Sequence, residues 1–158
     1  MSEMLTITRM TKPSFPVIGR EGTTDDGDGF IARLWEDANA HFWEIASLVL
    51  YDEQGSPRGI WGCMSDMSEQ FLPWEDNFTR GRYLAGAECS ADAQPPHTWS
   101  KWTVPGFVYL MIPNDTPDAF SRMLDYLDEH QIPLVGTVQE YTVPASGQSY
   151  LCFPTERL

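Results

Sequence analysis

Glu140 is the residue whose type and position suggest chemistry most directly. It lies in the strand-like segment Val135–Val143, where alternation places Gly136, Val138, Glu140 and Thr142 on one face. A carboxylate withdrawn from water must be paired or hydrogen-bonded, or it takes up a proton. A bound organic cation is a natural partner, and nearby aromatic faces would add about 0.5–2 kcal/mol each. The alternative is an exposed glutamate on an edge strand, and the residues alone leave the two interpretations level.

Aromatic residues are more frequent than a core of this size needs, with six Trp, six Tyr and eight Phe. We therefore expect some of them to line a cavity. Glu88 raises the same question as Glu140, at the end of the predicted strand Arg82–Ser90. Glu88, near Asp92 at a strand end, fits a solvated carboxylate better, and each aromatic taken singly fits the core better than a pocket, so the prediction rests on the group. The predicted ligand-binding residues are Glu140, Glu88, Trp61, Trp74, Trp102, Tyr109, Tyr141 and Tyr150.

Most catalytic templates are absent from the sequence. The three histidines have no serine or cysteine nucleophile in a G-x-S-x-G turn, and no phosphate-binding or dinucleotide loop occurs. One enzymatic route stays open, in which Glu140 acts as a general base and Tyr109 or Tyr141 orients the reacting group. We predict no cofactor.

Composition excludes several classes of function. Ten Lys and Arg stand against 23 Asp and Glu, a net charge of -13 that repels phosphate backbones, so direct nucleic-acid binding is not expected. The N-terminal MSEMLTITRMTK lacks the apolar core of a secretory signal, and no apolar run is long enough to span a membrane. The widely spaced Cys63, Cys89 and Cys152 suggest buried thiols in a reducing cytoplasm, and neither a disulfide framework nor a metal site.

Two segments with helical spacing must position these side chains. The first carries an apolar stripe over Ile31–Val49. The second runs through Phe120–Leu127, where Thr116 can cap, Pro117 suits the first helical position and Pro133 ends the segment.

Strand-like segments surround both helices. The order strand, helix, strand, strand occurs twice, which predicts an α+β fold with a curved antiparallel sheet and a cleft between the halves. We expect one domain over residues 1–158. The apolar loop Met67–Thr79, which contains Trp74, is either a lid over the cleft or a flap that seals the core. The predicted strands are Pro16–Glu21, Gly59–Ser65, Arg82–Ser90, Trp99–Ile112, Leu134–Val143 and Ser149–Pro154.

A pattern of aromatics, glycines and prolines covers residues Phe15 to Thr155. It comprises FPVIG, IARLWEDANAHF, GIWGCMSD and RYLAGAE in the first half, and WTVPGFVYLMIP, PLVGTVQEY and YLCFP in the second. With this pattern the chain resembles the GyrI-like effector-binding family, whose domains also occur in multidrug-responsive bacterial regulators. The resemblance implies the tandem architecture and a cleft that binds lipophilic, often cationic, compounds against a buried glutamate.

The resemblance gives Glu140, in QEY, the position of that glutamate, whereas Tyr150 stands where the family has a second acidic residue. The leading hypothesis is a stand-alone binding protein that senses or sequesters hydrophobic or cationic compounds. Some relatives hydrolyse reactive electrophiles, which keeps the hydrolase hypothesis open. Others modulate DNA gyrase, so a protein partner that meets the acidic surface is the third hypothesis.

Overall fold

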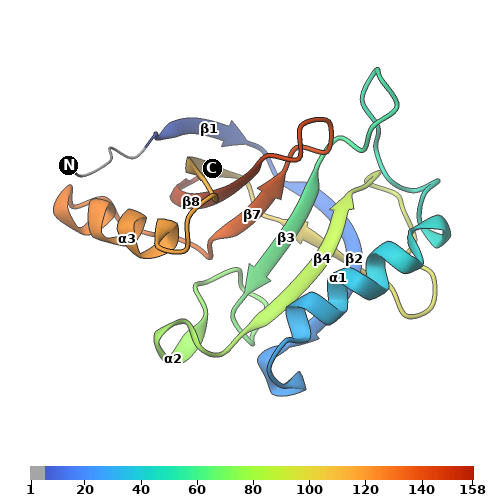
Figure 1. Cartoon of the computed structure of the whole chain (residues 1–158), viewed down its shortest axis with the longest axis horizontal. Helices are drawn as coiled ribbons and strands as arrows, with labels where there is room; N and C mark the ends of the chain where they lie inside the picture. The colour runs from blue at the N-terminus through green and yellow to red at the C-terminus, as the bar shows by residue number, and fades with distance from the viewer. Residues whose placement is uncertain (1–5) are drawn as a thin grey trace.

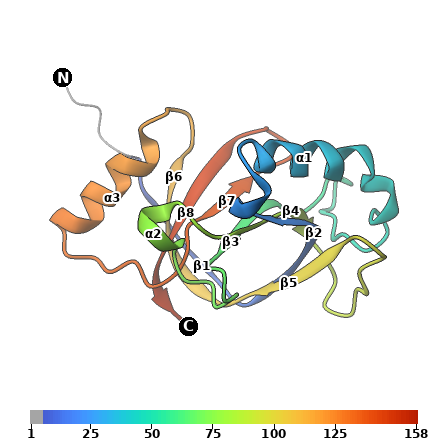
Figure 2. The same ribbon diagram turned by 90° about the horizontal axis from the view of Figure 1, so that it is seen from below.

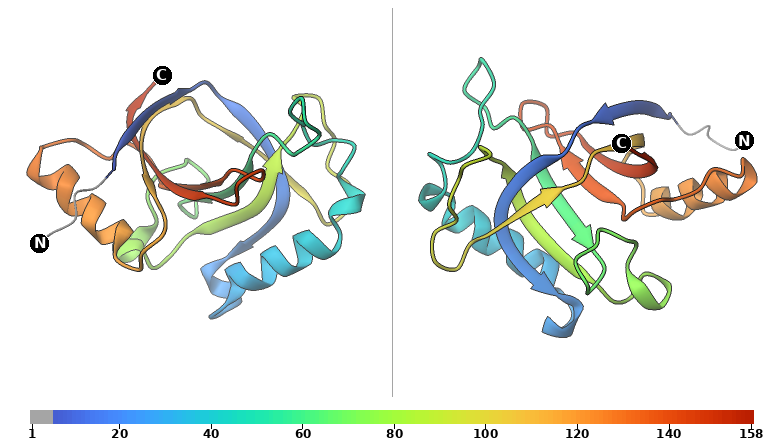
Figure 3. Two further views of the ribbon diagram at one scale, coloured as in Figure 1. Left: turned by 45° about the horizontal axis from the view of Figure 1, so that its top comes forward. Right: turned by 180° about the vertical axis from the view of Figure 1, so that it is seen from behind.

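The computed structural model describes residues 6–158, in which eight antiparallel strands form one sheet that curls into a half-barrel (Figures 1 and 3). The first five residues of the predicted domain lie outside the described part. The strands are β1 (Thr8–Lys12), β2 (Phe15–Thr23), β3 (Ile60–Ser65), β4 (Arg82–Glu88), β5 (Ser100–Val104), β6 (Phe107–Pro113), β7 (Gln139–Thr142) and β8 (Ser149–Arg157). The helices are α1 (Phe30–Ala40), α2 (Glu75–Phe78) and α3 (Ala119–Glu129), with 3-10 turns at Thr24–Asp26 and Phe42–Glu44.

The predicted tandem organisation is confirmed. The first unit is β2-α1-β3-β4 and the second is β6-α3-β7-β8. In each unit the last strand pairs with both others, which gives the orders β2-β4-β3 and β6-β8-β7. The pairing of β3 with β7 joins the units, so the fold is α+β with one curved sheet across both halves.

The curl comes from an exchange of strands between the units. β1 continues into β2 but pairs with β6, and β5 continues into β6 but pairs with β2. Lys12 lies opposite Phe107, and Phe15 lies opposite Val104, so the two outer edges of the sheet meet at one corner. The strands therefore surround a common interior, as the left view of Figure 3 shows.

The two faces of the sheet have separate cores. The interior cluster takes residues from all eight strands and includes the buried thiols of Cys63 and Cys152. α1 and α3 pack on the outer face, one over each half (Figure 2). The buried Cys89 belongs to the cluster with α1, and all three thiols are free, as the sequence predicted. None of the helices in residues 6–158 has the length and apolar composition needed to cross a bilayer.

The first helix is shorter than the predicted stripe. It ends at Ala40, because His41 has a φ of -118° and the chain then forms a 3-10 turn. The later members of the stripe are nevertheless buried, since Ile45 packs in the α1 cluster and Val49 forms an isolated bridge with Cys89. Packing against the end of the sheet therefore replaces the last two turns of the expected helix.

The strand predictions also differ from the structure in places, and β7 covers only Gln139–Thr142 of the predicted Leu134–Val143. The segment Trp99–Ile112 forms two strands, because Pro105 cannot donate a ladder hydrogen bond and the chain bends there. β1 was not predicted, since Thr8–Lys12 has one apolar residue and lacks the alternation of a half-buried strand. It lies at the edge of the sheet and pairs with β6 alone.

The Met67–Thr79 loop closes one end of the half-barrel. Phe71 enters the interior cluster and lies edge-on to Trp102, with ring centroids 5.7 Å apart. Trp74 passes to the outer face and stacks on Phe30 at 6.5 Å. Asp66 anchors the loop by accepting backbone hydrogen bonds, which together hold the pKa of its carboxyl below the ordinary value despite desolvation. Phe71 thus seals the interior, while Trp74 lies on the same side as the helices.

We predict that Gly86→Ala destabilises the protein by about 2–3 kcal/mol, as expected for an overpacked core. A Cβ at Gly86 would lie 2.1 Å from the carbonyl oxygen of Ile18, which is backbone and cannot move without shifting β2. Urea unfolding measures the loss. Gly22→Ala is the control, because its Cβ would meet only side chains, the nearest at 3.0 Å. Equal losses in the two variants would contradict the steric explanation.

Candidate functional site

Glu140 lies on the outer face of the sheet, where the two units join. Its partner across the β3–β7 pairing is Gly62. The hydroxyl of Tyr83 on β4 donates to Glu140 Oε1 at 3.3 Å, and Trp35 Nε1 on α1 donates to the Tyr83 hydroxyl at 3.0 Å. A hydrogen-bonded chain thus runs from the helix across the sheet to the carboxylate.

Gly62 makes this chain possible. A Cβ at this position would lie 2.0 Å from the Tyr83 hydroxyl oxygen and 3.3 Å from the Cβ of Glu140. Any side chain would displace the phenol from β3. The glycine therefore lets the Tyr83 ring cross the strand and reach the carboxylate.

Desolvation dominates the electrostatics of the site. It raises the pKa of Glu140 above its ordinary value, and the hydrogen bond from Tyr83 offsets only part of that rise. Burial and the adjacent Glu140 charge together raise the pKa of Tyr83, so its hydroxyl stays protonated as a donor. Within residues 6–158, no lysine, arginine or histidine forms an ion pair with Glu140.

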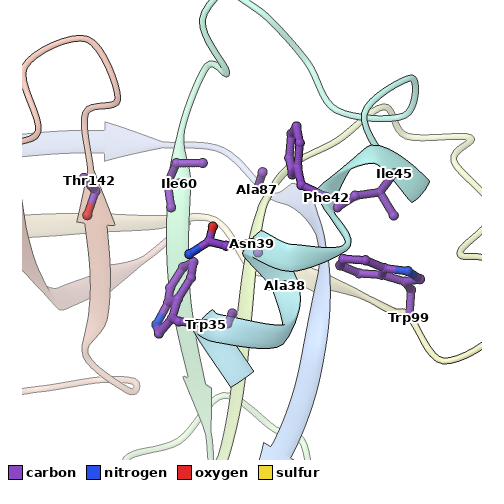
Figure 4. Close-up of a pocket in the computed structure, with 11 residues that line it drawn as sticks. Trp35, Ala38, Asn39, Phe42, Ile45, Ile60, Ala87, Trp99 and Thr142 are labelled. Atoms are coloured by element: carbon purple, nitrogen blue, oxygen red, sulfur yellow. The ribbon is translucent and has the colours of Figure 1, made fainter. Parts of the chain in front are cut away.

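A first cavity of about 240 Å³ opens between α1 and the sheet. Figure 4 shows Trp35 and Asn39 reaching into it from the helix, with Ile60 of β3 and Thr142 of β7 opposite. Ala85 and Ala87 of β4 also line it, and their short side chains leave the space open. The remaining lining residues are Ala38, Phe42, Ile45, Gly86 and Trp99.

Trp99 forms a fixed wall of the first cavity. Its Nε1 donates to Glu44 at 2.8 Å, and the Arg20 guanidinium lies 4.1 Å from its ring centroid. Arg20 is buried and forms ion pairs with Asp37 of α1 at 3.0 Å and with Glu44 at 3.7 Å. One arginine therefore connects the helix to the tryptophan on the other side of the cavity.

A second cavity, of about 180 Å³, lies near α3 and the Met67–Thr79 loop. Its walls are almost wholly apolar, and Phe78 of the loop meets Phe120 of α3 edge-on, with ring centroids 5.4 Å apart. The lining residues are Met64, Trp74, Phe78, Phe120, Thr137 and Val138.

Glu140 stands between the two cavities along the chain. Thr142, two residues after it, lines the first cavity, and Val138, two residues before it, lines the second. β3 repeats this arrangement, since Ile60 lines the first cavity and Met64 the second, with Gly62 between them. Alternate residues of β3 share a face, and Val138, just before β7, packs in the cluster with α3, so the carboxylate and both cavities lie on one side of the sheet.

Five predicted ligand-binding aromatics point the other way. They belong to the interior cluster, on the opposite face from Glu140. Trp61 packs against Tyr141 with ring centroids 4.7 Å apart, and Tyr141 stacks on Tyr150 at 6.4 Å. Tyr141 is the neighbour of Glu140 in sequence, so alternation sends its ring through the sheet. The five are Trp61, Trp102, Tyr109, Tyr141 and Tyr150, whereas Trp74 lines the second cavity.

Glu88 also lies away from Glu140 and has partners of its own. Its carboxylate is 3.1 Å from Lys12 Nζ and 3.9 Å from Arg58. The Lys12 ammonium lies 4.4 Å from the Phe15 ring centroid and 5.7 Å from that of Trp61. The chain's own lysine therefore supplies the cation at this second carboxylate.

Sequence reasoning missed Tyr83, Trp35 and Trp99 as site residues. A usable signal was the alternation Tyr83, Ala85, Ala87 on β4, which places one large polar ring beside two small side chains. The contact from Trp35 depends on how α1 packs, and periodicity does not give it. In the described part of the chain, no group of three or more His, Cys, Asp or Glu could hold a metal ion.

Comparison with solved structures identifies the fold. The C-terminal domain of EcmrR superposes with a TM-score of 0.67 and 9% identity, over 99% of this chain and 100% of that one. SAV2435 bound to tetraphenylphosphonium superposes with a TM-score of 0.54 and 16% identity, over 96% and 94%. An integron cassette protein from the mobile metagenome of Vibrio cholerae gives 0.58 and 15%, over 96% and 95%. No protein-family model and no curated protein matches the sequence. At these identities the likeness is one of fold, and it bears out the fold that the sequence resemblance predicted.

We predict that Glu140→Gln makes the ligand-free protein more stable at neutral pH. Because the folded-state pKa of Glu140 is raised, the native protein holds, at pH values between the two pKa values, a proton that the unfolded chain has lost. The free energy of unfolding of the wild type therefore falls as pH rises through the window between the two pKa values. Urea unfolding from pH 4 to pH 8 should show the advantage of the variant growing with pH. Glu129→Gln, on the exposed end of α3, is the control, and an advantage independent of pH would contradict the assignment to desolvation.

Proposed function

We propose that this chain, which has a GyrI-like fold, binds lipophilic organic cations with Glu140 as the counter-charge. The observation that carries the proposal is a half-buried carboxylate with a raised pKa and no ion pair from residues 6–158, flanked along its strand by residues that line two cavities. A carboxylate in such surroundings is costly unless a cation joins it. A ligand with a delocalised or shielded positive charge supplies that partner and carries its own apolar surface into the cavities.

Aromatic walls favour the same class of ligand. Trp35 and Trp99 line the first cavity, and Trp74 lines the second. A tryptophan face attracts a cation by about 0.5–2 kcal/mol, and more where water is excluded. Inorganic cations gain less here, because they would lose their hydration without enough oxygen ligands in return.

The structural neighbours support the proposal. SAV2435 was solved bound to tetraphenylphosphonium, a lipophilic cation, and the EcmrR domain belongs to a protein that was also solved on DNA. In this chain the matching chemistry would serve sensing or sequestration of a compound. The three buried, free thiols fit a reducing compartment such as the cytoplasm.

We predict saturable binding of tetraphenylphosphonium, detected by quenching of tryptophan fluorescence. Glu140→Gln should weaken binding about tenfold or more, because a charge-assisted interaction at a desolvated site is worth about 1.5–3 kcal/mol. Glu53→Gln, on an exposed loop, is the matched control and should bind as the wild type does. Equal affinity of the wild type and Glu140→Gln would refute the role of the carboxylate.

The hydrogen-bonded pair of Glu140 and Tyr83 also supports a second candidate function, that of a hydrolase. The hydroxyl beside the carboxylate is that of Tyr83, whereas Tyr109 faces the interior. A carboxylate with a raised pKa can act as a general base at neutral pH. Turnover of a strained electrophile that disappears in Glu140→Gln would favour this function, and stoichiometric binding without product would exclude it for that compound.

A further inference from the structure

We infer that the two cavities are lobes of one site, and that the ligand is a cation with an apolar arm on each side of its charge. This inference rests on the proposed function and specifies the shape of the ligand. Its basis is that the residues lining the two cavities lie on either side of the paired Gly62 and Glu140: Ile60 and Met64 on β3, and Thr142 and Val138 on the other chain segment.

The sizes of the cavities argue that neither is a complete site. Sites for drug-sized ligands have volumes of roughly 300–1,000 Å³. The first cavity has about 240 Å³ and the second about 180 Å³, so each alone falls short of that range and the pair lies within it. Each cavity suits one apolar group of a larger molecule.

The spacing places the charge between the arms. Ile60 and Met64 mark the two cavities on β3 and are four residues apart, which corresponds to about 13 Å along a strand. Glu140 pairs with Gly62, at the midpoint of that interval. A cation at the carboxylate is therefore about 6–7 Å from each lobe, a distance that a benzyl-sized arm can cover.

Each repeat supplies the helix of one lobe. Trp35 and Asn39 of α1 belong to the first lobe, and Phe120 of α3 belongs to the second. The first lobe also offers polar atoms of Asn39 and Thr142, whereas the second is closed by the rings of Trp74 and Phe78. The arms need not be equal: the first lobe accepts a polar substituent, and the second selects a hydrocarbon arm.

Two ammonium probes test the two-lobed site separately from the proposed function. Benzyltrimethylammonium has one apolar arm, and dibenzyldimethylammonium has two around the same kind of charge. Burial of a second ring should tighten binding about tenfold or more, measured by isothermal titration calorimetry with the whole chain. Both probes should lose affinity in Glu140→Gln, which tests the proposed function on its own.

Filling each lobe tests the two-lobed site directly. Asn39→Phe adds a ring at the first lobe from an exposed position on α1, and Met64→Trp enlarges a side chain of the second. Either substitution should remove most of the tenfold gain of the two-armed probe. Asn39→Ser and Met64→Leu are the controls, which change chemistry little and fill nothing. Thermal unfolding of each variant verifies that the fold is retained.

The outcomes are distinguishable. Equal affinity for the two probes, with both dependent on Glu140, would overturn the two-lobed site and leave the proposed function standing. A gain that survives both lobe-filling substitutions in folded protein would likewise overturn it. Absence of Glu140-dependent binding for both probes would overturn the proposed function and the inference with it.

Discussion

The pairing of β3 with β7 is the constraint on which the site depends. It consists of three residue pairs, Ile60 with Thr142, Trp61 with Tyr141 and Gly62 with Glu140. So short a ladder would specify register weakly on backbone hydrogen bonds alone. The fully buried Gln139 extends it, because its side-chain oxygen accepts from the backbone N–H of Met64 at 2.8 Å. A shift by one residue would send Glu140 into the interior and Tyr141 to the helices, so the join between the units also decides which face carries the charge.

The two faces of the sheet treat a carboxylate in opposite ways. On the interior face, Glu88 is neutralised by Lys12, whose ammonium also lies over the rings of Phe15 and Trp61. On the outer face, Glu140 accepts a hydrogen bond from the Tyr83 hydroxyl, and the residues two positions before and after it line the two cavities. On the interior face, the protein itself supplies the carboxylate, the cation and the aromatic rings. On the outer face, the protein supplies the carboxylate and the rings, and we propose that the ligand supplies the cation.

Local pattern was enough to predict the repeat and the approximate position of the second helix. Both follow from periodicity, but the start of the helix was predicted wrongly: Thr116 was expected to cap and Pro117 to begin the helix, whereas α3 begins at Ala119 with Asp118 at the N-cap. The partners of Glu140 did not follow, because Tyr83 and Trp35 reach it through strand order and helix packing, which periodicity does not encode. The prediction placed Tyr141 and Glu140 in one pocket, although neighbouring residues of a strand point to opposite faces. Lys12, the partner of Glu88, was not predicted because it lies on β1, which lacks apolar alternation.

Protonation and cation binding are alternative ways to relieve the same desolvation at Glu140. The proton must come from solvent, because the pKa of Tyr83 is raised by burial and by the Glu140 charge, and its hydroxyl keeps its hydrogen. Trp35 donates to that hydroxyl, so the phenol hydrogen is directed at the carboxylate and stabilises its charged form. The hydrogen-bonded chain therefore opposes the rise in the pKa of Glu140 that desolvation causes. An ionised carboxylate held in this way, and not a neutral acid, is what distinguishes a cation from a neutral molecule of the same shape.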